Sequence, residues 1–513
     1  MKFRGLAIIA AAAMMLASCG GTENPTPSSG GGSSSVTFSV TPTTLDFDAD
    51  GGTKDITVTA SAKPSATPNQ SWITRTIGDL SNNKVTITVT AKANTSTSER
   101  TAELSLKQGD NTAKVTITQA GKSSGGSTTT TTVSATEEPE ALNNEAWAFS
   151  KKLGFGWNLG NHFDTYPMTY GYWDKATPTK ALFTKLKSYG FSSVRIPVTW
   201  YVHADDNMLV EDDFMEEVAE VVGWARDAGL NVILNTHHDD ADSKNWLSLA
   251  KAVASSSAKA EITEKFNYLW TQIATRFKDE GDYLIFESFN EMHDGSWGIP
   301  DGSATSYYEV INYWNQQFVN TVRATGGNNA TRMLGVPGYA ASPSLTLGYL
   351  EIPTEPDASV TCKIAVSIHD YDPYAYTIGG KYDQWGHTAA SGKAPSEKEK
   401  DYAQTLRNLY DAYLANNIPV YIGECGCANK FGDTAINFKK YYIEYTFKAM
   451  KSYGLAGFVW DNNGEGSGDT AGYVNHATGE YLTNGETYVS LMKKAYTNTS
   501  SNYTLESVYN SAP

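Results

Sequence analysis

Eight short apolar runs recur after residue 150, and helix-patterned stretches separate them. Each run is the length of one buried strand, whereas the stretches between runs repeat apolar residues at the three-and-four spacing of a helix face. Parallel strands need a crossover of this kind, usually a helix. Eight strand-then-helix units predict a (β/α)8 barrel, an α/β fold, over residues 140–513. The expected strands lie in residues 154–160, 193–198, 231–237, 284–290, 332–338, 364–371, 419–426 and 455–462.

Residues 36–121 follow a different pattern. Apolar residues alternate strictly with polar ones, as in Val85, Ile87 and Val89, and threonine fills the other face. This period of two, interrupted by turn residues, predicts an all-β immunoglobulin-like sandwich of six or seven strands. The segment resembles the BACON module, an immunoglobulin-like domain of carbohydrate-acting lipoproteins. We interpret it as a spacer, because its sequence offers no obvious aromatic platform for a sugar.

Residues 1–19 have the composition of an export signal. Lys2 and Arg4 precede an apolar run that is too short to span a bilayer. The sequence "LASC" at residues 16–19 resembles a bacterial lipobox, which implies cleavage before Cys19 and lipidation of that cysteine. An ordinary signal peptide with a chance cysteine is the alternative. We expect an exported lipoprotein at the outer membrane or cell surface that touches the membrane only through its lipid anchor. Residues 20–35 and 122–139 are rich in Gly, Ser and Thr, which predicts a flexible tether and a linker.

The net charge limits the kind of partner. A charge of −16 argues against a polyanion such as nucleic acid and favours a neutral substrate. Aromatic residues make up 12% of the chain, and their flat rings can stack on sugars as well as fill cores.

Ionisable and aromatic residues stand at the C-terminal ends of the expected barrel strands. Catalytic groups of (β/α)8 barrels gather on that face. Two carboxylic acids that face each other across a cleft, surrounded by aromatic rings, are the arrangement that glycoside hydrolysis needs. The residues at these ends are Arg195, His237, His238, Asn290, Glu291, His369, Tyr371, Glu424 and Trp460.

The same strand ends carry motifs that resemble glycoside hydrolase family 5. The motifs are "GWNLGN", "VRIPVTW", "NTHHD", "FESFNEM", "SIHDYDPY", "YIGECG" and "GFVWDN". The resemblance implies a retaining mechanism in which Glu424 is the nucleophile and Glu291 is the general acid and then the base. Arg195 and Tyr371 would keep Glu424 ionised, and the charge of Glu424 would raise the pKa of Glu291. The two carboxyl groups would then stand roughly 5–5.5 Å apart.

The resemblance also implies contacts to the substrate. Asn290 would donate to the sugar 2-hydroxyl, and Trp460 would form the floor of the −1 subsite. His237 and His369 would hold the sugar and orient Glu291. Further substrate-binding candidates are Asn161 in "GWNLGN" and His238. The loop residues Trp173, Trp297 and Trp385 are candidates as well, each as a sugar platform or, alternatively, as a packing residue.

Strand alternation raises a geometric problem at residues 290–291. Neighbours on an unbroken strand point to opposite sides, so Asn290 and Glu291 both reach the cleft only if the strand is bulged or already ending. Glu287 has the parity of Glu291 but lies deeper, and we expect it to be a paired interior carboxylate. By the same alternation His237 and His238 diverge, so we expect no metal site and no cofactor.

These features predict a retaining endo-β-1,4-glucanase. We expect a monomer that acts on xyloglucan, cellulose-like glucan or mixed-linkage β-glucan. One alternative is a β-mannan-active enzyme of the same family, because the axial 2-hydroxyl of mannose is read by loop positions that the sequence does not place. Another is a non-catalytic glycan-capture lipoprotein, which would need neither Glu291 nor Glu424.

Overall fold

The computed structural model describes residues 37–49, 51–70, 72–94, 100–120, 132–166, 173, 176–240, 245–297 and 305–513. These residues form two compact units, a β-sandwich and a (β/α)8 barrel, and each is described by itself. The predicted export signal with Cys19 and the predicted tether lie outside the described residues, and the predicted domain boundaries stay predictions. Within the described part of the chain, every helix is too short or too polar to traverse a lipid bilayer.

The β-sandwich consists of two four-stranded sheets. Their strand orders are β1-β3-β6-β5 and β2-β8-β7-β4. The sequence predicted six or seven strands, and the structure has eight in this unit. Strand β4 lacks the alternating apolar pattern on which the prediction depended, because Ala66 is its single buried apolar residue. The strands are β1 (Ser39–Thr41), β2 (Thr44–Phe47), β3 (Gly52–Thr59), β4 (Ser65–Pro68), β5 (Ile73–Ile77), β6 (Lys84–Ala91), β7 (Arg100–Gln108) and β8 (Asn111–Gln119).

The second unit is a closed barrel of eight parallel strands, which confirms the predicted fold class. The barrel closes because β16 pairs with β9. Each strand lies within one of the eight predicted runs. The strands are β9 (Phe155–Leu159), β10 (Ser193–Ile196), β11 (Asn231–Asn235), β12 (Leu284–Glu287), β13 (Leu334–Pro337), β14 (Ile364–Asp370), β15 (Val420–Cys425) and β16 (Ala456–Asp461).

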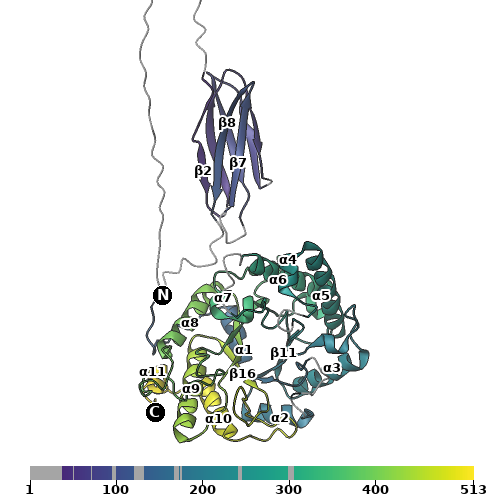
Figure 1. Ribbon diagram of the computed structural model, residues 1–513, viewed down its shortest axis with the longest axis vertical. Helices are drawn as coiled ribbons and strands as arrows, with labels where there is room; N and C mark the ends of the chain where they lie inside the picture. Colours follow the sequence, from purple (N-terminus) through teal and green to yellow (C-terminus); the bar gives the residue numbers. More distant parts are fainter. Residues whose placement is uncertain are drawn as a thin grey trace, which may run out of the picture. The chain divides into compact units, whose positions relative to one another are not determined.

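Helices surround the barrel strands, as the ring around β11 and β16 in Figure 1 shows. The α-helices are α1 (Glu145–Leu153), α2 (Lys180–Tyr189), α3 (Asp212–Asp227), α4 (Leu249–Ala254), α5 (Ser256–Arg276), α6 (Thr305–Ala324), α7 (Pro343–Thr346), α8 (Glu399–Ala412), α9 (Asp433–Ser452), α10 (Gly485–Thr497) and α11 (Leu505–Tyr509). Short 3-10 helices are η1 (Trp200–His203), η2 (Gly327–Ala330), η3 (Tyr339–Ala341) and η4 (Leu414–Asn416).

Two apolar layers hold the barrel together. The larger layer lies between strands and helices, and it includes Leu182, Phe183 and Leu186, which are the buried residues of α2. The smaller layer fills the barrel interior, where Leu153 of α1 joins residues from the strands. Its strand residues are Ile233, Ile285, Ala365, Tyr421, Ala456 and Phe458. The interior is therefore packed below the strand ends, as expected for this fold.

At the C-terminal face one strand ends early and two others pair irregularly. Strand β12 ends at Glu287, three residues before Asn290, so the prediction that this strand is already ending is confirmed. Between β14 and β15, Ile368 pairs with Ile422 and His369 pairs with Glu424, which leaves Gly423 as an extra residue. Such a bulge re-aims the side chains that follow it. It sets Glu424 beside His369 on the C-terminal face.

Candidate active site

A cleft of about 1300 Å³ opens at the C-terminal ends of the barrel strands. Both glutamates singled out by the sequence line it, together with every predicted strand-end residue except Arg195, which lies beneath it. Of the predicted loop residues, Asn161, Trp173 and Trp297 also line it, whereas Trp385 does not. The structure thus gathers residues from distant parts of the chain around one cavity.

Glu424 lies at the end of β15 and receives two hydrogen bonds. Arg195 donates through Nη1 to Oε1 over 2.6 Å, and the Tyr371 hydroxyl donates to Oε2 over 3.0 Å. Burial raises the pKa of the Glu424 carboxyl, and the ring of His369 and the charge of Arg195 oppose that rise. Because a guanidinium and a phenol donate to separate oxygens, the ionised form of Glu424 is the one that fits this site.

Glu291 follows β12 and faces Glu424 from the other side of the cleft. Its Oε1 lies 2.8 Å from Nδ1 of His369, and that nitrogen lies 3.7 Å from Oε1 of Glu424. Burial raises the pKa of Glu291 to about 7, with a further rise from the charge of Glu287 and an opposing effect of Arg195. The direction agrees with the sequence-based expectation, but the rise comes from burial and the charge of Glu287, and the charge of Glu424 is not among its causes. Burial lowers the pKa of His369 to about 4, so its ring is neutral beside a protonated Glu291 near neutral pH.

The separation of the two carboxyl groups bears on stereochemistry. Oxygen atoms of Glu291 and Glu424 and a ring nitrogen of His369 all lie within 4.8 Å of one another. Retaining glycosidases hold their carboxyls about 5–5.5 Å apart, whereas inverting enzymes leave about 6.5–9.5 Å for a water molecule. The observed separation fits direct attack by one carboxylate on the sugar.

Arg195 and Glu287 form a buried ion pair beneath the cleft. Arg195 donates to Glu287 Oε1 through Nε over 3.1 Å and through Nη2 over 2.7 Å. The same Nη2 donates to Oδ1 of Asn290 over 2.8 Å. The amide nitrogen of Asn290 is therefore left to face the cleft as a donor. Both Arg195 and Glu287 are completely buried, and the expectation that Glu287 is a paired interior carboxylate is confirmed.

His237 and His238 follow β11, and the expected divergence of their side chains is wrong. Strand β11 ends at Asn235, so strand alternation no longer applies, and the two rings lie 4.3 Å apart. Nδ2 of Asn235 lies 3.3 Å from Nδ1 of His237 and donates to Glu287 over 3.0 Å. Because the amide nitrogen is a donor, Nδ1 of His237 accepts and its Nε2 carries the proton toward the cleft.

Aromatic side chains line the cleft at several places. The ring of Trp460 is parallel to that of His237, with centroids 5.9 Å apart. Trp173 packs edge-on against Tyr166 and His238. Trp297, which is 60% exposed, rests on the ring of His293. Exposed rings that already have a supporting neighbour are suited to stacking on a flat sugar face.

The expectation for Trp385 is wrong. This residue is completely buried, where it packs against Tyr441, Tyr442 and Tyr445 of α9 and donates to the carbonyl oxygen of Glu397. The loop after β14 instead presents Tyr374, which lines the cleft and is 63% exposed. Tyr374 could have been noticed in the "DYDPY" sequence, but no periodicity in a loop distinguishes an exposed ring from a buried one.

Asp164 is a second residue that the sequence reasoning missed. It is buried and accepts hydrogen bonds from the backbone nitrogens of Asn161 and His162, which fixes the loop after β9. Burial raises the pKa of Asp164 to about 7. Its carboxylate lies within 4.8 Å of ring nitrogens of His237 and His238. Asp164 therefore positions Asn161, which borders the cleft at a φ of 62°.

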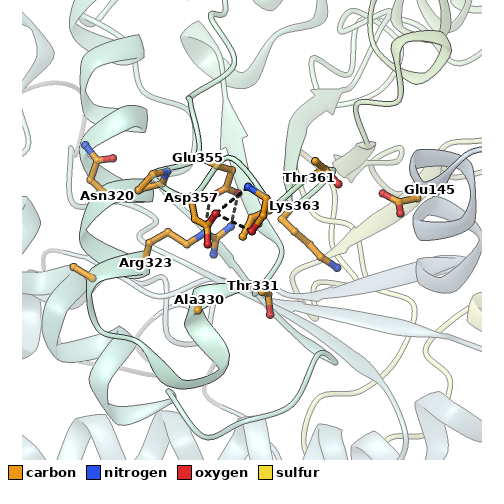
Figure 2. A pocket seen from close by; sticks show the side chains of 13 residues that line it. Glu145, Asn320, Arg323, Ala330, Thr331, Glu355, Asp357, Thr361 and Lys363 are labelled. Atoms are coloured by element: carbon orange, nitrogen blue, oxygen red, sulfur yellow. Dashed lines mark hydrogen bonds and ion pairs between the residues drawn. The ribbon is translucent and has the colours of Figure 1, made fainter.

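A separate cavity of about 730 Å³ lies at the opposite end of the barrel. Lys363 and Thr331, which precede β14 and β13, line it. Figure 2 shows the Arg323 guanidinium directed at the Glu355 carboxylate, which it binds through two 2.7 Å hydrogen bonds. Residues at this end of such barrels serve stability, and Arg323 and Glu355 are paired with each other here.

Comparisons with known proteins agree with this geometry. The family model described as cellulase (glycosyl hydrolase family 5) matches residues 153–466. The BACON model, described as a putative N-terminal binding domain, matches residues 60–120. A xyloglucan-specific endo-beta-1,4-glucanase of Bacteroides ovatus is 30% identical over 442 residues, which is 81% of this chain and 84% of that protein.

Two solved structures are similar to the chain. One, titled a native Bacteroidetes-affiliated GH5 cellulase linked with a polysaccharide utilization locus, has a TM-score of 0.70 at 37% identity and covers 73% of this chain and 99% of its own. The other, a broad specificity endoglucanase from Bacteroides salanitronis, has a TM-score of 0.67 at 39% identity and covers 71% of this chain and 98% of its own.

Proposed function

Because this chain belongs to glycosyl hydrolase family 5, we propose that it is a retaining endo-β-1,4-glucanase that cleaves internal bonds of a neutral plant β-glucan. The observation that carries the proposal is the placement of a carboxylate oxygen of Glu291 within 4.8 Å of a carboxylate oxygen of Glu424 in one cleft. The names of similar proteins support the substrate class, since they include cellulases and a xyloglucan-specific glucanase.

In the first step, Glu424 attacks the anomeric carbon and Glu291 gives its proton to the departing glycosidic oxygen. A glycosyl-enzyme ester forms as the glycosidic bond breaks. Arg195 and Tyr371 hold the attacking carboxylate, and the raised pKa of Glu291 supplies the proton near neutral pH. The amide nitrogen of Asn290 donates to the sugar 2-hydroxyl, where the contact strengthens in the transition state.

In the second step, Glu291 takes a proton from water, which attacks the anomeric carbon and releases Glu424. Esterification removes the negative charge of Glu424, so the positive charge of Arg195 is no longer shared with it. Since Arg195 lowers the pKa of Glu291, this change favours loss of the Glu291 proton when a base is needed. Because the ester of Glu424 carries no charge, Arg195 then forms an ion pair with Glu287 alone.

The finer substrate choice rests on the open cleft and its aromatic rings. We include xyloglucan, cellulose-like glucan and mixed-linkage glucan, because a cavity of about 1300 Å³ leaves room around a single chain of glucose units. The β-mannan-active and glycan-capture alternatives are not favoured. The similar proteins are named as glucanases, and a capture protein needs no acid held at a pKa of about 7 beside an ionised partner.

The test is hydrolysis of a polysaccharide panel by the wild-type protein and by Glu424→Ala. Wild-type protein should release oligosaccharides from xyloglucan or β-glucan faster than from β-mannan, and Glu424→Ala should lose that activity while still binding the polymer. Equal hydrolysis by both proteins contradicts the assignment. Binding without hydrolysis by the wild type supports a capture protein instead.

The cellular location of the protein follows from the N-terminal sequence. We propose export as a lipoprotein anchored through Cys19 at the outer membrane or cell surface, with the "LASC" sequence as support. In a bacterial host fed with labelled palmitate, the wild-type chain should incorporate label and Cys19→Ser should not. Label in the Cys19→Ser protein, or none in either, contradicts the anchor.

A further inference from the structure

The two oxygens of the buried Glu287 carboxylate serve different neighbours. Oε1 accepts hydrogen bonds from Arg195 and from Nδ2 of Asn235. Oε2 accepts from the hydroxyls of Ser367 over 2.8 Å and of Tyr421 over 2.7 Å. With five hydrogen bonds, the carboxylate is fully satisfied although it is completely buried. The Oε1 side leads to the cleft, whereas the Oε2 side leads into the barrel interior.

The Oε1 side connects Glu287 with three groups at the cleft. Arg195 contacts Glu424 and Asn290 as well as Glu287, so Glu287 shares the guanidinium with the nucleophile. Asn235 accepts from the backbone nitrogen of Val198 through Oδ1, which leaves its amide nitrogen for Glu287 and His237. Glu287 thereby fixes the amide that selects the tautomer of His237.

The charge of Glu287 also acts on Glu291 and on Arg195. Burial alone would raise the pKa of Glu287, but Arg195, His369 and Tyr421 hold it below its ordinary value, so it is ionised. Its negative charge raises the pKa of Glu291 and, together with Glu424, that of Arg195. The titratable and charged groups around it come from β10, β14 and β15 and from the segment that follows β12. They are Arg195, Glu291, His369, Tyr421 and Glu424.

We propose that Glu287 is a positioning residue whose charge, acting through Arg195 and Asn235, sets the ionisation of the Glu291–Glu424 pair and the donor that His237 offers to the sugar. Glu287 touches no substrate, since it is buried beneath the cleft. Its negative charge competes with Glu424 for the positive charge of Arg195. Without that competition the guanidinium would hold Glu424 more tightly and make it a weaker nucleophile. The proposal rests on the hydrolytic function proposed above.

The substitution Glu287→Gln separates charge from shape. The side-chain carbonyl can take the place of Oε1 and keep Arg195 and Asn235 as donors, while the amide faces the hydroxyls of Ser367 and Tyr421, which can rotate to accept. The variant therefore keeps the hydrogen-bond geometry and loses the charge. Ser367→Ala and Tyr421→Phe are matched controls, because each removes one donor from Oε2 and leaves the charge in place.

The readout is the pH dependence of kcat/KM on a soluble β-glucan, with thermal unfolding measured in parallel. In Glu287→Gln both limbs of the bell-shaped pH profile should move to lower pH, by about one pH unit. Glu291 loses a nearby negative charge, and Arg195, no longer shared with Glu287, stabilises the ionised Glu424 more strongly. The maximal kcat should fall. In Ser367→Ala and Tyr421→Phe the protein should unfold at a lower temperature, with the bell unmoved.

A second variant tests the proposed effect on His237 through Asn235, and it leaves residue 287 unchanged. Asn235→Ala removes the amide between Glu287 and His237, so KM should rise while the bell stays in place. Two results overturn the proposal. One is a pH profile of Glu287→Gln that coincides with the wild-type profile, and the other is a shift that Ser367→Ala or Tyr421→Phe reproduces. An inactive wild-type protein would instead refute the proposed hydrolytic function, so the two failures are distinguishable.

Discussion

The alkaline limit of activity should be set by Glu291. Its pKa of about 7 means that at pH 8 about one tenth of the molecules keep the proton that the leaving group needs. The kcat/KM for a β-glucan should therefore fall by about tenfold for each pH unit above 7. His369 cannot cause this limb, since burial lowers its pKa to about 4 and its ring is already neutral there.

The assay compares two substrates over pH 5–9. A dinitrophenyl cellobioside has a leaving group that needs no proton, whereas a glucan has one that does. In Glu291→Gln, kcat/KM for the glucan should fall by roughly 10²–10⁴-fold, whereas kcat/KM for the dinitrophenyl substrate should fall far less and show no alkaline limb near pH 7. An alkaline limb near pH 7 that persists in Glu291→Gln with the activated substrate would refute the assignment of the acid.

The same pKa has a consequence for stability. The folded-state pKa of the Glu291 carboxyl is raised, so the native protein binds this proton more tightly than the unfolded chain does. The contribution of this group to the free energy of unfolding therefore decreases as pH rises from about 4.5 to about 7. In Glu291→Gln this part of the pH dependence of thermal unfolding should disappear.

Three further predictions concern the cleft. Trp297→Ala and Tyr374→Ala should each raise KM for a polysaccharide severalfold, because both rings are exposed in the cleft. KM for an aryl cellobioside should change little. Trp385→Phe is the control, and it should lower the unfolding temperature without changing KM. Tyr371→Phe removes a hydrogen bond to Glu424 that is worth about 1.5–3 kcal/mol, so the acid limb of kcat/KM should move to higher pH, and an unmoved limb would contradict the contact. Dialysis against EDTA should leave kcat unchanged, since the proposed steps use only side chains and water, and a loss restored by a divalent ion would contradict them.

The sequence predicted the barrel well because its strands are buried on both faces. Such strands appear as continuous apolar runs, and all residues of β9, β12, β14 and β15 are indeed buried. The polar residues that follow these apolar runs could therefore be expected to meet on the C-terminal face. This reasoning located Arg195, Glu291 and Glu424 without any knowledge of the loops.

Loop positions could not be predicted in the same way. Trp385 and Tyr374 follow the same strand, yet one ring packs on α9 and the other reaches the cleft. Sequence distance from a strand end does not determine which way a loop folds back. The contacts of Asp164 with its own loop backbone also escaped notice, because a buried aspartate among polar residues has no periodic signature.

The directions of side chains at the ends of strands could not be predicted from the sequence either. Alternation led to the expectation that His237 and His238 point apart, but β11 stops at Asn235 and both rings reach the same side. The extra residue Gly423 likewise changes the parity of Glu424 on β15. A backbone irregularity of one residue is invisible in a hydrophobic pattern and decides which side chains face the substrate.

The configuration of the first product tests the central claim most directly. If Glu424 forms an ester and Glu291 then activates water, each of the two displacements inverts the anomeric carbon. Proton NMR recorded within minutes of adding enzyme to a cello-oligosaccharide should show the β-anomer first, before mutarotation produces the α-anomer. An initial product in the α configuration would show a single displacement and would contradict the roles given to Glu291 and Glu424.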